Sequence, residues 1–257
     1  MDGLSKNTTM EHPTPAIKEA ASLIKGARYL TAFTGAGISV ESGIPPFRGP
    51  GGLWGKYDPR TLEIDYFLAS PARAWPVIKE IFYDNFGTAK PNTAHLALAR
   101  LEAAGRLKVL ITQNIDNLHY IAGSRNIAEF HGNSRKLLCL SCGVKVDARP
   151  ELLLTLPPRC PCGGTYKPDF IFFGEGIPRD AYALSEEAAG RSDVMLVVGS
   201  TGEVYPAASV PRLAKEAGAV IIEVNPGISA FTDSITDIHI PLPAGEAFRL
   251  LEKEILL

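Results

Sequence analysis

The stretch that decides the fold of this chain runs from Thr34 to Gly49 and reads TGAGISVESGIPPFRG. It follows the apolar, strand-like run 29–33, and its glycines and hydroxyls let backbone N–H groups approach an anion at the start of a helix. The ordinary dinucleotide fingerprint places two residues between its second and third glycines, whereas five residues separate Gly37 from Gly43 here. A Gly-x-Gly turn alone is equally consistent with a tight strand-to-helix connection. Phe47 and Arg48, on a loop stiffened by two prolines, favour a functional site, because loops carry function more often than packing.

The length and composition predict one substantial α/β domain with a small insert. The chain has 257 residues, of which 46% are hydrophobic. Its 26 Lys and Arg against 28 Asp and Glu give a net charge of -2, which provides no electrostatic attraction to nucleic acid or to an anionic membrane. We therefore expect no membrane and no direct nucleic-acid partner. Residues 1–15 contain no apolar core segment, which argues against a signal peptide and predicts a cytoplasmic protein.

The four cysteines lie within 24 residues of one another, in the pattern Cys-x-x-Cys, 17 residues, Cys-x-Cys. In a reducing compartment this spacing indicates a metal site before it indicates disulfides. Two thiolate pairs on glycine turns can close a tetrahedral zinc site with no open position for catalysis, so we predict one structural Zn²⁺. Four unliganded thiols are the alternative. The single residue between the second pair requires a tighter turn than usual; the predicted ligands are Cys139, Cys142, Cys160 and Cys162.

Several apolar runs are each followed directly by polar residues. The runs 109–111, 127–130, 194–198 and 220–224 precede Gln113 to Asp116, His131, Gly199 to Thr201, and Asn225. Helical patterns alternate with these runs at 14–26, 70–86, 92–104, 207–217 and 246–256. The alternation predicts an open parallel sheet, and the carboxyl edge of such a sheet is where ligands bind.

Three polar residues after the run 109–111 and one histidine are the candidates for chemistry. Asn114 and Asp116 alternate on an extended segment and could face one pocket, whereas Gln113 faces elsewhere. Capping of the following helix is an equal alternative for Asp116. His131 stands at a strand end, where a neutral imidazole can take a proton from a hydroxyl group. The remaining histidines have no comparable setting; they are His12, His95, His119 and His239.

Taken together, these motifs resemble the sirtuins, a family of NAD-dependent protein lysine deacylases, in a short prokaryotic-type form. The motifs occur in the family's order from about residue 16 to the end: GAGIS at 35–39, SGIPPFRG at 42–49, TQNID at 112–116, HG at 131–132, the cysteine pairs, FGE at 173–175, GST at 199–201 and VN at 224–225. The resemblance implies that NAD and acyl-lysine enter a cleft between two domains. It implies a Rossmann-like parallel sheet with helices on both faces in an NAD-binding domain of residues 14–50, 106–135 and 168–257. The rest of the chain would form a cofactor-binding loop and helical insert at 51–105 and a small zinc-binding domain, a zinc-ribbon module, at 136–167.

The resemblance also implies roles for residues at matching positions. His131, Asn114 and Asp116 would be catalytic. The enzyme, which we expect to be a monomer, would release nicotinamide, O-acyl-ADP-ribose and free lysine. The zinc would take no part in the reaction. NAD, as co-substrate, would contact Gly35, Ala36, Gly37, Ser39, Phe47, Arg48, Gln113, Asn114, Asp116, Gly199, Ser200, Thr201, Asn225, Ala244 and Gly245. An acyl-lysine protein or peptide would add a strand between two edges of the protein and insert the acyl-lysine side chain into a tunnel. The residues of the edges and the tunnel would be Phe47, Ile171, Phe173, Gly174, Glu175, Gly202, Glu203 and Val204.

Two departures from the family pattern concern the substrate. Sirtuins that prefer succinyl-lysine carry a Tyr-x-x-Arg pair where this chain has Ile78 and Ile81, so a preference for neutral acyl groups is predicted. Gly202-Glu203 replaces an apolar pair, which predicts tolerance of basic residues beside the target lysine.

Two other functions compete with deacylation. A mono-ADP-ribosyltransferase or an NAD hydrolase would use the same pocket. A non-enzymatic zinc-ribbon binding module would require a basic surface, yet the basic residues of the segment are offset by Asp147 and Glu151.

Overall fold

The fold is built around a six-stranded parallel sheet with strand order β3-β2-β1-β7-β8-β9. The computed structural model describes residues 13–47 and 51–256. Because β2 and β7 flank β1, the order of the strands reverses directly beside the glycine-rich stretch, and ligands of α/β sheets bind at such a reversal. The predicted α/β class is confirmed. The strands are β1 (Leu30–Thr34), β2 (Leu107–Thr112), β3 (Ile127–Glu129), β7 (Val194–Val198), β8 (Val220–Val224) and β9 (Ile238–Ile240).

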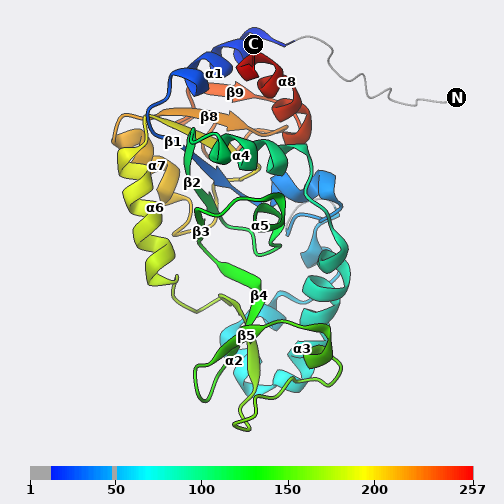
Figure 1. Cartoon of the computed structure of the whole chain (residues 1–257). Coiled ribbons are helices and arrows are strands. Elements are labelled where there is room, and N and C mark those ends of the chain that lie inside the picture. Colours follow the sequence, from blue (N-terminus) through cyan, green and yellow to red (C-terminus); the bar gives the residue numbers. More distant parts are fainter. Residues whose placement is uncertain (1–12, 48–50, 257) are drawn as a thin grey trace, which may run out of the picture.

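Helices cover both faces of this sheet (Figure 1). On one face lie α1 (Pro15–Gly26), α4 (Thr93–Ala103) and α8 (Ala244–Leu256); on the other lie α6 (Arg179–Arg191) and α7 (Ser209–Glu216). All five residues of β1 and of β7 are buried, as expected for central strands enclosed by two helical layers. The start of α1 follows the predicted pattern, because Thr14 Oγ1 accepts a hydrogen bond from Ile17 N at 3.3 Å and Pro15 occupies the first turn.

A smaller lobe carries a three-stranded antiparallel sheet with strand order β5-β4-β6 (Figure 1). The hydrophobic core of this lobe joins the small sheet to the helices that precede it in the chain. Trp75, buried in this core, donates a hydrogen bond from Nε1 to Tyr166 O at 2.9 Å. The elements are β4 (Gly132–Cys139), β5 (Lys145–Asp147), β6 (Tyr166–Phe170), α2 (Ile64–Ala69), α3 (Pro71–Lys79) and the 3₁₀ helix η6 (Pro150–Leu153).

Two helical predictions differ from the structure in detail. The segment 70–86 is not one α-helix, because α3 widens into a π-helix, η4 (Glu80–Asn85), and ends as the 3₁₀ helix η5 (Phe86–Thr88). The wider turn allows Ile81, Phe82 and Phe86 all to be buried in the small-lobe core. After the glycine turn the chain forms a 3₁₀ helix, η1 (Ala36–Ser42), rather than an α-helix, and it ends at Gly43 with φ +85°.

Two further 3₁₀ helices, η2 (Leu53–Gly55) and η3 (Pro59–Leu62), lie between the glycine-rich stretch and α2. The helix α5 (Leu118–Ala122) follows the end of β2. Within the part of the chain that the structure describes, no helix combines the length and apolarity needed to cross a membrane.

Candidate functional site

A cavity of about 890 Å³ opens at the carboxyl edge of the large sheet and continues toward the small lobe. Most of the predicted site residues line it. From the predicted cofactor set these are Gly35, Ala36, Gly37, Phe47, Gln113, Asn114, Gly199, Ser200, Thr201, Asn225 and Ala244. From the predicted peptide set they are Ile171, Phe173, Gly174, Glu175, Glu203 and Val204, and His131 lies among them. The cavity wall does not include Ser39, Asp116, Gly202 or Gly245, and Arg48 lies outside the described residues.

The glycine turn after β1 packs backbone against backbone on the turn after β7. Gly35 N donates to Val198 O at 3.0 Å, and Gly37 N donates to Gly199 O at 2.8 Å. A Cβ atom on Gly37 would lie 2.7 Å from Gly199 Cα, and Gly199 itself has φ +63°. Both positions therefore require glycine, and the two strand ends approach closely enough for one ligand to contact both.

Asn114, in the cavity wall, forms a buried hydrogen-bonded group with Ser39 and Asp116, which lie behind the wall. Ser39 Oγ donates to Asp116 Oδ2 at 2.7 Å and accepts from Asn114 Nδ2 at 3.3 Å. Asn114 Nδ2 also donates to Gly35 O at 3.1 Å. Asp116 Oδ1 accepts from Leu118 N at 2.9 Å, so this carboxylate accepts from the first backbone N–H of α5 and also holds Ser39. Burial raises the pKa of Asp116, and the hydrogen bonds from Leu118 and Ser39 oppose that change.

Two histidines that the sequence offered no reason to select belong to the same buried region. His95 Nε2 lies 3.4 Å from Ser39 Oγ, and His119 Nε2 lies 3.0 Å from Thr34 Oγ1. Their ring centroids are 4.8 Å apart. Burial lowers the pKa of His95 to about 4; burial, and then the proximity of His95, lowers the pKa of His119. Both imidazoles are therefore neutral at pH 7. No local signal marks them, because Ser39 and Thr34 are distant from them in sequence.

His131 lies in the cavity wall at the point where the two lobes meet. Its Nδ1 atom is 2.9 Å from Gln113 O, at the end of β2. Burial lowers the pKa of His131, and the hydrogen bond to Gln113 partly offsets that effect. Gln113 Nε2 in turn donates to Ser200 Oγ at 3.0 Å, and Asn225 Nδ2 donates to Ser200 O at 3.2 Å. The polar ends of β2, β7 and β8 thus form one connected surface, as the sequence predicted.

Aromatic side chains form the roof of the cavity. The ring centroids of Phe47 and Trp54 are 5.4 Å apart, and those of Trp54 and Phe173 are 6.4 Å apart. Phe173 is also held by its backbone, because its N–H donates to Leu62 O at 2.8 Å and its carbonyl accepts from Ile64 N at 3.0 Å. Trp54 was not among the predicted site residues, although it lies in the segment 51–105 that was predicted to contain a cofactor-binding loop.

The charged side chains in the described cavity wall are all acidic: Glu41, Glu175 and Glu203. Ile78 and Ile81 do not reach the cavity, because both are buried in the small-lobe core behind Phe170 and Phe172. The described part of the wall offers no cation to an anionic acyl group, and the preference for neutral acyl groups stays a prediction. A Tyr and Arg placed at 78 and 81 would, however, enter a packed core and would not test that prediction.

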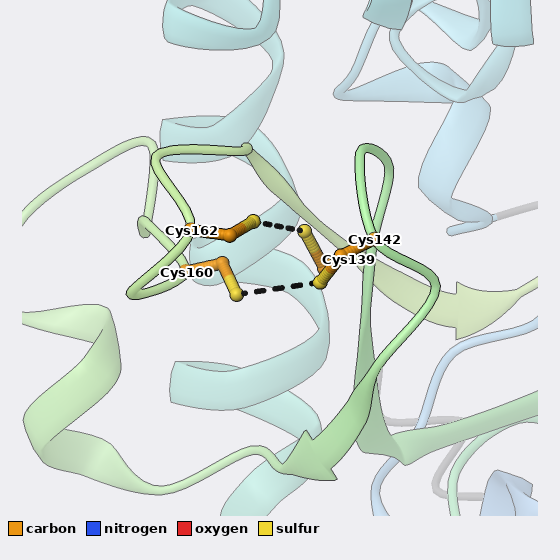
Figure 2. A group of neighbouring side chains, drawn as sticks. All are labelled: Cys139, Cys142, Cys160 and Cys162. Carbon is orange, nitrogen blue, oxygen red and sulfur yellow. Dashed lines mark hydrogen bonds between the residues drawn. The ribbon is translucent and has the colours of Figure 1, made fainter.

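The four cysteines converge in the small lobe (Figure 2). Their Sγ atoms lie within 4.8 Å of one another; Cys139 and Cys162 are 3.5 Å apart, and Cys142 and Cys160 are 3.8 Å apart. A tetrahedral Zn²⁺ with bonds of about 2.3 Å requires sulfur–sulfur distances of about 3.8 Å, so all four ligands fit one zinc ion. Gly143 and Gly163 follow the pairs with φ +72° and +88°, as the tight turns require.

The chain is similar to known proteins over most of its length. Residues 35–206 match the model of the Sir2 family. The NAD-dependent protein deacylase 2 of Pyrobaculum aerophilum is 45% identical over 240 residues, which is 91% of this chain and 94% of that protein. The NAD-dependent protein deacylase of Aeropyrum pernix is 46% identical over 236 residues, covering 90% and 94% of the two chains. A solved complex of Sir2 with a p53 peptide and NAD⁺ superposes with a TM-score of 0.85 at 36% identity, covering 94% of this chain and 99% of that one.

Proposed function

The chain belongs to the Sir2 family and is an NAD-dependent protein deacylase, and from this premise we propose how its residues divide the reaction. The single observation that carries the proposal is that His131 shares one cavity with the glycine turn and the polar strand ends. We assign Gly35 to Gly37, Gly199 to Thr201 and Asn225 to the ADP-ribose part of NAD. Both turns line the cavity and lie against each other, so one pyrophosphate can contact both.

Bound NAD supplies an electrophilic ribose carbon with nicotinamide as its leaving group. His131 acts as general base toward a ribose hydroxyl. Because its Nδ1 atom donates to Gln113 O, the Nε2 atom of the neutral ring keeps its lone pair for that proton. Asn114 is positioned by Gly35 and Ser39, and Asp116 acts from behind the wall by fixing Ser39. Phe47, with Trp54 beside it, excludes water from the reacting atoms.

The peptide adds as an extended strand between residues 173–175 and 202–204. The backbone N–H and carbonyl groups of Glu203 have no hydrogen-bond partner within the described part of the chain, so they are available to a substrate strand. The exposed Glu203 side chain also has no partner there, which favours a basic residue beside the target lysine. The acidic and apolar cavity wall favours neutral acyl groups, since a buried acyl carboxylate would find no cation in the described part of the wall.

The zinc ion is structural, because its four ligands leave no open coordination position and no cysteine lies in the cavity wall. The cavity and the cysteine cluster are each completed by one chain, so we propose that a monomer is active. Free cysteines placed as metal ligands favour a reducing compartment, which we take to be the cytoplasm.

Product analysis tests the function against its alternatives. Acetyl, butyryl, myristoyl and succinyl peptides are incubated with and without NAD, and the products are identified by mass spectrometry. Deacylation predicts free lysine and O-acyl-ADP-ribose in equal amounts, and only with NAD. ADP-ribosylated protein as the main product would indicate a transferase, and free ADP-ribose without peptide turnover would indicate an NAD hydrolase.

A further inference from the structure

Lys167, on β6, is a buried cation that the reaction does not use. Its side chain is only 4% exposed, and a lysine this buried needs partners for its charge. Its Nζ atom donates to Pro168 O at 3.1 Å and to Phe170 O at 2.6 Å, and it lies 2.9 Å from Glu175 Oε2. It also lies 4.4 Å from the centre of the Phe172 ring. All four partners belong to residues 168–175, which lead from β6 to the cavity.

Glu175 is fixed from two sides. Its Oε2 atom accepts from Phe172 N at 2.6 Å as well as from Lys167, and its own N–H donates to Phe172 O at 3.0 Å. These bonds close a turn around Gly174, which has φ +93°. The carboxylate therefore joins the cation of Lys167 to the backbone of the turn.

The turn itself is part of the cavity wall, whereas the residues before it are held by other bonds. Ile171 N donates to His131 O at 2.9 Å, and Phe173 pairs with the segment that begins α2. Lys145 forms an ion pair with Asp169, but the Lys145 side chain is 57% exposed, so that ion pair contributes little to the stability of this segment. Among the described residues, Lys167 is the one cation whose nitrogen contacts the turn at 174–175.

We propose that Lys167 is a positioning residue for the substrate peptide. It holds the turn that presents Gly174 and Glu175 to the peptide, and it joins that edge to the strand that follows the second cysteine pair. Without the ammonium group, the Glu175 carboxylate and two backbone carbonyls lose their partner in a mostly buried place, so the turn relaxes. The inference rests on the proposed function, because it takes residues 173–175 as a peptide-binding edge.

The test compares Lys167→Met with the matched control Lys136→Met, which removes an exposed ion pair to Asp147 in the same small sheet. Binding of a fluorescent acetyl-lysine peptide and the KM values for peptide and NAD are measured on the zinc-loaded protein. We expect Lys167→Met to weaken peptide binding and raise the peptide KM by about tenfold, with the NAD KM within about twofold. Lys136→Met changes neither by more than about twofold.

Two further variants keep the test decisive if Lys167→Met does not fold. Lys167→Arg retains the cation and should keep most of the peptide affinity. As a single substitution, Glu175→Gln should weaken peptide binding. In the Lys167→Met background it should cause little further loss, because the two residues act as one unit. Unchanged peptide affinity in folded Lys167→Met, additive effects of the pair, or equal losses for peptide and NAD would overturn the proposal. A wild-type protein that binds no acyl-lysine peptide would instead contradict the proposed function.

Discussion

The Nδ1 atom of His131 lies 2.9 Å from the carbonyl oxygen of Gln113. A carbonyl oxygen can only accept, so Nδ1 carries a proton and the neutral ring presents Nε2 as its basic atom. Gln113 is itself held, because its side chain donates to Ser200 Oγ at 3.0 Å. The orientation of the His131 ring is therefore set by the ends of β2 and β7, which line the same cavity.

The first prediction concerns the pH dependence of catalysis. Burial lowers the pKa of His131 below the usual 6.5, so the ring stays neutral and active to a lower pH than a free histidine would. The value of kcat/KM should fall as the pH decreases, with an apparent pKa below 6.5, and His131→Ala should lose about 10²- to 10⁴-fold in rate. Rates are measured over the range in which the protein remains folded. An acidic limb centred above 6.5 would contradict this assignment.

The second prediction concerns stability in acid. His95 has a pKa of about 4 when folded and an ordinary value of 6.5 when unfolded, so the unfolded chain binds the additional proton as the pH falls. The contribution of neutral His95 to the free energy of unfolding is fully present above pH 6.5 and is lost between pH 6.5 and 4. The loss amounts to about 2 kcal/mol between pH 7 and pH 5. Denaturant unfolding of the wild type and of His95→Gln at both pH values measures it. An equal pH dependence in the two proteins would disprove the role of His95.

The polar strand ends could be predicted from sequence because each follows its own apolar run. Asn114, His131, Ser200 and Asn225 are local signals, and the parallel sheet brings such ends together wherever the strands pair. The closed cysteine cluster was predictable for a similar reason, since the spacing of two pairs on glycine turns already limits what they can bind.

The interior of the site could not be predicted in this way. The contact of Ser39 with His95 spans 56 residues, and that of Thr34 with His119 spans 85 residues. Nothing in the neighbourhood of either histidine distinguishes a buried partner of the site from an ordinary core histidine. Lys167 is a comparable case, because a lysine in sequence predicts exposure, and only the folding of residues 168–175 around its side chain makes it buried.

The third prediction concerns zinc. The metal content should be one Zn²⁺ per chain, and both chelation and Cys142→Ser should lower the melting temperature and loosen the small lobe. Trp75 reports this directly, because its indole N–H donates to Tyr166 O on the strand after the cysteines. In a Trp54→Phe background, Trp75 is the single tryptophan, and its fluorescence should shift to the red when zinc is removed. Val144→Ser, at an exposed position near the first pair, should keep the zinc.

The fourth prediction concerns the acyl group. Succinyl-lysine should be turned over with a kcat/KM about a hundredfold or more below that of butyryl-lysine, because its carboxylate finds no cation in the described wall. The matched control is the neutral amide of the succinyl group, which has almost the same size. The amide should recover much of the lost rate. If the acid and its amide were equally poor, the size or polarity of the terminal group rather than its charge would explain the difference.

The fifth prediction concerns the residues beside the target lysine. Glu203 is exposed at the cavity rim and has no side-chain partner in the described part of the chain, so its charge is available to the peptide. A peptide with lysine at the flanking position should have a KM about three- to tenfold lower than one with glutamate, and 0.5 M salt should reduce the difference by screening. Glu203→Lys should reverse the preference. Glu216→Lys, an exposed change of the same charge at the end of α7, is the control for net charge and should leave the order of the peptides unchanged. An identical preference in Glu203→Lys and the wild type would show that another part of the surface determines the preference for the flanking residue.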